Sequence, residues 1–114
     1  MASVFLVEDE VLIRMMVNDM LEELGHTIAA EAGDLASALT LAKSANFDIA
    51  IIDVSLGQHN SAPVAKALRA RGVPFAFASG YASDGVPEEF RERPLLKKPF
   101  QSEQLERCIA QLLT

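Results

Sequence analysis

The stretch VFLVEDEVLIR, residues 4–14, places three consecutive acids between two apolar segments. The run SVFLV, residues 3–7, has the length and the composition of a buried strand. From Val11 onward the apolar residues recur at the spacing of three and four that is typical of an amphipathic helix. Because almost no loop separates the strand from the helix, Glu8, Asp9 and Glu10 either cap the helix or bind a ligand.

The same alternation of strand and helix continues to the end of the chain. Further strands are predicted at residues 27–32, 48–53, 74–79 and 94–97, and helices at Val11–Leu24, Leu35–Ala45, Pro63–Arg71 and Ser102–Leu113. Asp34 can cap the second helix, Pro63 suits the first turn of the third, and Gly25 and Gly72 suit helix ends. Five strands alternating with helices predict an α/β fold, a doubly wound five-stranded parallel sheet of order 2-1-3-4-5 with helices on both faces.

The first helix is expected to bury one apolar face against this sheet. Its predicted core residues are Ile13, Met16, Val17, Met20, Leu21 and Leu24. Three apolar residues beside that face, Val11, Leu12 and Met15, predict a docking patch for a helical partner. The alternative is that neighbouring loops shield them.

The composition narrows the class of protein. A length of 114 residues suits one domain, 1–114, with no output domain. The sequence contains neither a signal peptide nor an apolar run of membrane-spanning length, which predicts a cytoplasmic protein. A net charge of -6 with scattered Lys and Arg argues against nucleic-acid binding. The single cysteine, Cys108, lies at helical spacing among apolar residues and is interpreted as a packing residue.

Polar side chains follow four of the predicted strands. They are Glu8 and Asp9 after strand one, Asp53 after strand three, Ser79 after strand four and Lys98 after strand five. Each alone has an ordinary alternative, because Asp9 can be a helix cap, Asp53 and Ser79 turn residues and Lys98 a solvated charge. Together they would meet at the carboxyl edge of the sheet, where converging carboxylates require a cation.

That constellation suits phosphoryl chemistry. Mg²⁺ takes one or two carboxylates together with phosphate oxygens, and a carboxylate can be the nucleophile for a phosphoryl group. Asp53 is the best placed nucleophile, Lys98 can pair with the acids or with the phosphoryl group, and Ser79 can donate a hydrogen bond. Strand two, at the edge of the predicted sheet, contributes only Glu31, which is not expected to take part.

The motifs VED (7–9), IIDVSLG (51–57), FASGY (77–81) and KPF (98–100) resemble the receiver domain of two-component response regulators, over the whole chain. The resemblance implies a flavodoxin-like, CheY-like fold and a phosphoacceptor role for Asp53. It also implies Mg²⁺, with Mn²⁺ as a substitute, held by Asp9, Asp53 and the backbone carbonyl of Ser55, with Glu8 acting through water. Ser79 and Lys98 would then read the phosphoryl group, and the Lys98-Pro99 bond would be cis.

More narrowly, the sequence resembles stand-alone receivers with a Phe-Ala-Thr-Gly-Tyr signature, whose partners are histidine kinases of the HWE type or phosphotransfer proteins. The implied function is to accept a phosphoryl group and then either signal through protein interactions or serve as a phosphate sink. Two features depart from the wider family. Leu95 stands where many receivers carry an aromatic switch residue, and Tyr81 either replaces that switch or is a packing residue. Residues 83–93, with Gly85 and Pro87, permit only a short helix.

Three rival classes fit less well. A haloacid-dehalogenase-type phosphatase would have an acid at the position of Ser55, and a flavodoxin-like carrier would have a phosphate-binding loop where the acids lie. A receiver-like protein used only for binding would normally lack an acid or the lysine.

Overall fold

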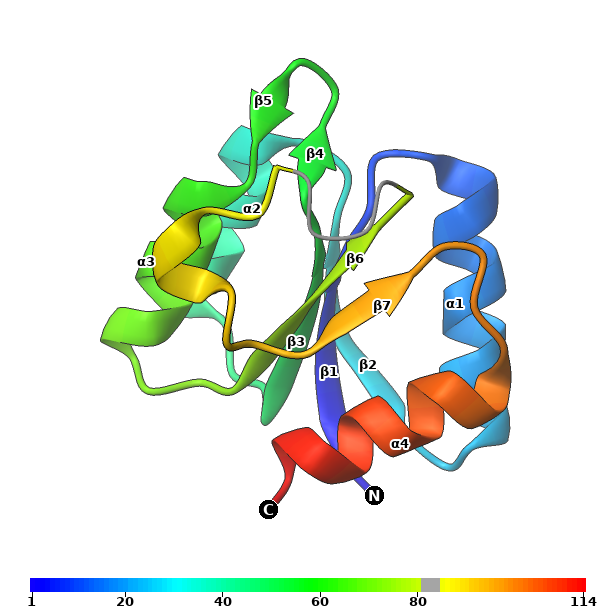
Figure 1. The fold of residues 1–114 in the computed structure, drawn as a ribbon. Helices are drawn as coiled ribbons and strands as arrows, with labels where there is room; N and C mark the ends of the chain where they lie inside the picture. Colours follow the sequence, from blue (N-terminus) through cyan, green and yellow to red (C-terminus); the bar gives the residue numbers. More distant parts are fainter. Residues whose placement is uncertain (81–84) are drawn as a thin grey trace.

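A computed structural model of the chain describes residues 1–80 and 85–114 and contains one parallel sheet between two layers of helices (Figure 1). The strands are β1 (Ser3–Val7), β2 (Thr27–Ala32), β3 (Ile49–Asp53), β6 (Phe75–Ser79) and β7 (Leu95–Lys97). Their order is β2-β1-β3-β6-β7, all parallel, which confirms the predicted fold class and the 2-1-3-4-5 order. The helices are α1 (Val11–Glu23), α2 (Leu35–Ser44), α3 (Ala62–Ala70) and α4 (Ser102–Leu112).

The central strands are apolar because helices cover both faces of the sheet. Every residue of β3 and β6 is buried, as expected for the middle of a doubly wound sheet. Asp53 pairs in register with Ala78, and Ser79 pairs with Lys97. The strands therefore end at one edge, and the polar residues that follow them are brought together there.

The helix ends follow the predicted local signals. Asp34 Oδ1 accepts a hydrogen bond of 2.8 Å from the Ser37 amide at the start of α2. Pro63 lies in the first turn of α3, and Gly25 and Gly72 have φ angles of 87° and 72° after α1 and α3. At the start of α1, by contrast, the N-cap residue Glu10 forms no side-chain capping hydrogen bond. The acids before α1 are therefore not explained by capping.

One element was not predicted. A short hairpin, β4 (Ser55–Leu56) and β5 (His59–Asn60), rises above the carboxyl edge of the sheet before α3 (Figure 1). Its two-residue turn begins at Gly57, whose φ of 63° suits glycine. Between β6 and β7 the described residues contain only η1, a single 3-10 turn at Glu88–Phe90, which confirms the prediction of a short helix there.

The two faces of the sheet are covered unequally. On the face of α2 and α3, Phe75 packs edge to face against Phe77 and Phe90, and these two rings are tilted relative to each other, with all centroids 5.6 to 6.0 Å apart in the core. On the other face, α1 buries only two of its own residues, Val17 and Leu21, against the sheet and α4.

The predicted burial of Met16 is wrong, because this side chain is 57% exposed. Met16 and Met20 line an open apolar groove of about 270 Å³ with Ile13, Val17, Lys98, Pro99 and Phe100. We call this surface the α1 groove. No element among the described residues covers Met16 there, whereas Ile13, Met20 and Leu24 are half-buried against the core.

Cys108 lies on the buried face of α4, within the core, which confirms its interpretation as a packing residue. Burial raises the pKa of its thiol to about 11. Among residues 1–80 and 85–114, no helix has the length and apolar character needed to cross a membrane.

Candidate functional site at the carboxyl edge of the sheet

The ends of four strands enclose a polar cleft of about 330 Å³. Its lining residues are Asp9, Glu10, Asp53, Ser55, Ser79, Gly80 and Lys98. We call this the acidic cleft. It contains five of the residues predicted from the strand ends and motifs, and the sixth, Glu8, reaches it through an ion pair with Lys98.

Lys98 connects the ends of β1 and β3. Its Nζ donates a hydrogen bond of 2.7 Å to Asp53 Oδ2 and a second, short one to Glu8 Oε1. The Lys98 amide donates to the Ser79 carbonyl at 2.8 Å, and the Lys98-Pro99 peptide bond is cis, as predicted. The side chains of Lys98, Asp53 and Glu8 are only 17%, 10% and 4% exposed. These ion pairs are therefore shielded from water and from salt.

Burial dominates the electrostatics of Glu8. It raises the pKa of this carboxyl to about 7, although hydrogen bonds from Lys98 and from the Glu10 amide oppose the shift. Burial acts in the opposite sense on Lys98, but hydrogen bonds to Asp53 and Glu8 outweigh it and raise the pKa of the ammonium. Lys98 therefore stays charged at neutral pH, while the carboxyl of Glu8 ionises near pH 7.

Asp9 lies at the mouth of the cleft and contacts the unpredicted hairpin. Its Oδ2 accepts a hydrogen bond of 2.9 Å from the Gly57 amide. Burial opposes ionisation of Asp9, but the hydrogen bonds it accepts, led by that of Gly57, outweigh this effect and lower its pKa. Asp9 is thus a carboxylate at neutral pH. The sequence motif predicts a role for Ser55 in this segment but none for Gly57. A contact made by a backbone amide does not depend on the residue type, so it cannot be recognised from the sequence.

The three acids form a group that suits a metal ion. One carboxylate oxygen from each of Glu8, Asp9 and Asp53 lies within 4.8 Å of the other two. All of these donors are hard oxygen atoms, which match Mg²⁺ and not the softer metals that prefer sulfur or imidazole. Ser55 is exposed at the rim, where its amide donates to Asp53 Oδ1 at 3.3 Å. The donor set therefore fits a hard dication.

The other predicted residues lie around this cleft. Val11, Leu12 and Met15 are exposed on α1, by 57%, 77% and 57%, so neighbouring loops do not shield them. Leu95, in β7, is 36% exposed. Tyr81, the candidate substitute for the aromatic switch, lies outside the described residues. Glu31 does not enter the cleft and instead pairs with Arg14 and Asn18.

Comparisons with known proteins agree with this geometry. SdrG from Sphingomonas melonis Fr1 is 43% identical and has a TM-score of 0.88, with 100% of this chain and 98% of that chain covered. The BeF3-activated conformation of SdrG is 42% identical, with a TM-score of 0.83 and coverage of 98% and 96%. The receiver domain of Erythrobacter litoralis PhyR is 27% identical, with a TM-score of 0.84 and coverage of 98% and 89%.

A curated relative, the transcriptional regulatory protein PdtaR of Mycobacterium tuberculosis, is 32% identical over 85% of this chain and 49% of its own length. This chain thus spans about half the length of the curated relatives that it matches. The response regulator receiver domain family matches residues 4–110, which include every residue of the acidic cleft. The chain belongs to the response regulator receiver domain family of two-component signalling.

Proposed function

We propose that this protein accepts a phosphoryl group on Asp53, in a Mg²⁺-dependent reaction, from a histidine kinase or a histidine phosphotransfer protein. The observation that carries the proposal is the meeting of Asp53, Lys98 and the acidic pair Glu8 and Asp9 in one shielded cleft. The family assignment supports it, and so does the existence of a BeF3-activated conformation of SdrG.

The reaction uses Asp53 as the nucleophile. A carboxylate oxygen of Asp53 attacks the phosphorus of a phosphohistidine, and the P–N bond breaks as the new P–O bond forms, with its electron pair leaving on the imidazole nitrogen. Asp9, Asp53 and the carbonyl of Ser55 would hold Mg²⁺, with Glu8 acting through water and Mn²⁺ able to substitute. When bound, the metal would supply positive charge to the oxygens of the transferring group.

Lys98 and Ser79 are proposed to read the result. Lys98 Nζ already contacts Asp53, so its ammonium is in place to pair with a phosphoryl group attached there. Ser79, at the end of β6, would donate its hydroxyl to the same group. Phosphorylation adds about one and a half to two negative charges, which would draw both side chains inward and shift the loops after β3 and β6. Hydrolysis would reset the protein, with Ser55 beside the path of the attacking water.

The exposed residues Val11, Leu12 and Met15 are proposed to dock the phosphodonor. They lie on α1 next to both the acidic cleft and the α1 groove, and Met16 extends their apolar surface. A helical partner, such as a histidine kinase of the HWE type, would bring its phosphohistidine to the cleft mouth. Methionine side chains are flexible and adapt to different partners, which suits a docking surface on α1.

The proposal treats residues 1–114 as one receiver domain in the cytoplasm that acts through protein contacts or as a phosphate sink. The near-complete coverage of the SdrG chain supports the single-domain reading. Among the described residues between β6 and β7, η1 is a single turn that packs Phe90 into the core, so these residues do not form a long helix.

The test is the intact mass of the protein after incubation with phosphoramidate, with and without Mg²⁺. Wild type is expected to gain one phosphoryl group only with Mg²⁺, and Asp53→Asn is expected to gain none. Asp48→Asn is a matched control, since Asp48 accepts a hydrogen bond from the Ser3 amide at the opposite edge of the sheet. This control should be phosphorylated like wild type. Wild type that is folded but gains no mass would contradict the proposal and favour a role in binding alone.

A further inference from the structure

Arg14 lies outside the acidic cleft but holds the backbone that carries two of its acids. Its Nη1 donates a hydrogen bond of 2.8 Å to the carbonyl oxygen of Glu8. That carbonyl belongs to the peptide bond between Glu8 and Asp9, so fixing it fixes the plane from which both side chains project. On the other side, the Glu8 amide donates to the Ala32 carbonyl at 3.0 Å. Both polar groups of the Glu8 backbone are therefore held.

The guanidinium of Arg14 is itself held from a second direction. Its Nε lies 3.4 Å from Glu31 Oε1, and Asn18 Nδ2 donates to the same oxygen at 2.9 Å. The side chain of Arg14 is 21% exposed and that of Glu31 is 41% exposed, so this contact lies at the surface and is partly screened by water. Glu31 at the end of β2, which was not expected to take part in the site, thus orients the arginine that contacts the backbone of Glu8.

Gly33 provides the room for this arrangement. A Cβ atom added at Gly33 would overlap Arg14 Nη1, and it would also lie 3.5 Å from Arg14 Cζ and 3.6 Å from the Glu8 carbonyl oxygen. The φ of Gly33 lies outside the positive range that favours glycine, in contrast to Gly25 and Gly72. The backbone conformation at residue 33 is therefore open to other residues. Glycine is needed there because the Arg14 guanidinium occupies the space of a Cβ atom.

We propose that Arg14 is a positioning residue of the acidic cleft, which fixes the Glu8–Asp9 peptide so that both carboxylates face Asp53 and the cation between them. The inference deepens the proposed function and rests on it for the identity of the cation. Glu31 orients Arg14, and Gly33 leaves space for it. Outer partners that orient metal ligands typically change metal affinity by about 10 to 100-fold when they are removed.

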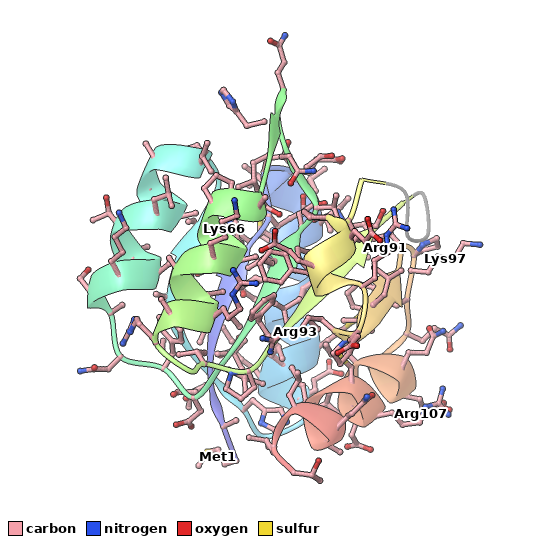
Figure 2. All side chains as sticks on the ribbon, turned by 60° about the vertical axis from the view of Figure 1, so that its left-hand side comes forward. Met1, Lys66, Arg91, Arg93, Lys97 and Arg107 are labelled. Atoms are coloured by element: carbon pink, nitrogen blue, oxygen red, sulfur yellow. The ribbon has the colours of Figure 1, made fainter. Side chains whose placement is uncertain are left out.

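A positioning role and simple electrostatics predict opposite changes in Mg²⁺ affinity when Arg14 is replaced. Removing a positive charge near three carboxylates should strengthen the binding of a dication, because one repulsive charge has gone. Loss of positioning should weaken binding, because the carboxylates no longer converge. Arg14→Met is thus expected to raise the Kd for Mg²⁺ about tenfold. Arg107→Met makes the same change of net charge on α4, where Arg107 points outwards (Figure 2), and is expected to leave the Kd within about twofold of wild type.

The experiment is a calorimetric titration of each variant with Mg²⁺ alone. Gly33→Ala keeps every charge and displaces only the guanidinium, so it should weaken binding in the same direction as Arg14→Met. The double variant should be little worse than either single one, because both changes break the same contact. Arg14→Lys keeps the charge but not the planar fork, and should lie between wild type and Arg14→Met; it serves as the test if Arg14→Met does not fold.

A second measurement does not depend on the metal. The amides of Glu10 and Gly57 donate to Glu8 Oε2 and Asp9 Oδ2, and their hydrogen exchange in metal-free protein reports where the two carboxylates lie. Exchange at both amides should be faster in Arg14→Met than in Arg107→Met. If wild type binds Mg²⁺ and Arg14→Met binds it equally or more tightly, the positioning role is overturned. If wild type binds no Mg²⁺, the proposed function fails, and unchanged exchange would then overturn the positioning role separately.

Discussion

The acidic cleft and the α1 groove lie side by side and share Lys98, yet they are opposite in chemistry. The ammonium of Lys98 contacts Glu8 and Asp53 in the cleft, while the same residue lines the groove beside Met16 and Met20. The cleft is assembled from strand ends up to 90 residues apart in the chain, and its acids outnumber its lysine. The groove is formed by α1 and the loop after β7, with almost only apolar side chains. One arrangement suits the proposed chemistry, and the other suits the proposed docking.

The largest effect is expected from breaking the link between the two surfaces. Lys98→Met keeps a long apolar side chain for the groove but leaves Glu8 and Asp53 without their cation. We expect the free energy of unfolding to fall by about 3 kcal/mol, at the lower end for a broken buried ion pair, because Glu8 can take up a proton in compensation. Urea unfolding at pH 7.5 with a chelator would measure it.

Lys97→Met is the matched control for this change. Lys97 is the preceding residue, and its side chain points from β7 into solvent (Figure 2). Its replacement should alter the free energy of unfolding by less than about 0.5 kcal/mol. Equal losses in the two variants would mean that the charge of Lys98 contributes nothing specific to the cleft.

A smaller effect should separate the two surfaces by their response to pH. The pKa of Glu8 is raised by burial from 4.5 to about 7 in the folded protein. A carboxyl whose folded pKa is raised contributes stability that is fully present below pH 4.5 and is lost as pH rises through about 7. The lowered pKa of Asp9 has the opposite sign but acts below its ordinary value of 3.8. Between pH 4.5 and about 7, where Glu8 ionises, the metal-free protein should lose on the order of 2 kcal/mol of stability as pH rises.

Glu8→Gln should flatten this dependence, whereas Met16→Ala in the groove should leave its slope unchanged. The measurement is urea unfolding at intervals between pH 4.5 and 7.5. A slope that survives in Glu8→Gln would assign the titration to another group.

The same contrast explains which features the sequence could predict. The strands and helices follow from apolar periodicity, and a parallel sheet places the residues after its strands at one edge, so Asp53, Ser79 and Lys98 could be assigned to one site from their positions alone. Met16 could not be placed, because its spacing on α1 shows only that it adjoins the buried face. Whether it is buried depends on what packs against that part of α1, which periodicity does not contain.

Contacts made through the backbone were the other gap. Gly57 binds Asp9 through its amide, and Arg14 binds Glu8 through a carbonyl, so neither contact depends on a complementary pair of side chains that a sequence search could match. The need for glycine at position 33 could not be predicted either, because it comes from the Arg14 guanidinium, whose position only the structure shows. The hairpin β4–β5 was missed because its strands are two residues long, below the length at which alternation can be recognised.

The smallest expected effect tests the docking surface itself. Met15→Asp places a charge on the exposed apolar surface of α1 without touching the acidic cleft. With a kinase that phosphorylates wild type, transfer to this variant should slow about tenfold, or about 1.4 kcal/mol in the transition state, because a desolvated carboxylate would face apolar side chains of the partner. Phosphorylation by phosphoramidate, which needs no docking, should keep its wild-type rate.

Leu113→Asp makes the same change at an exposed residue after α4 and should leave both rates unaltered. Equal slowing of Met15→Asp with both donors would mean that the substitution disturbs the cleft, and the α1 surface would then have no separate role in recognition.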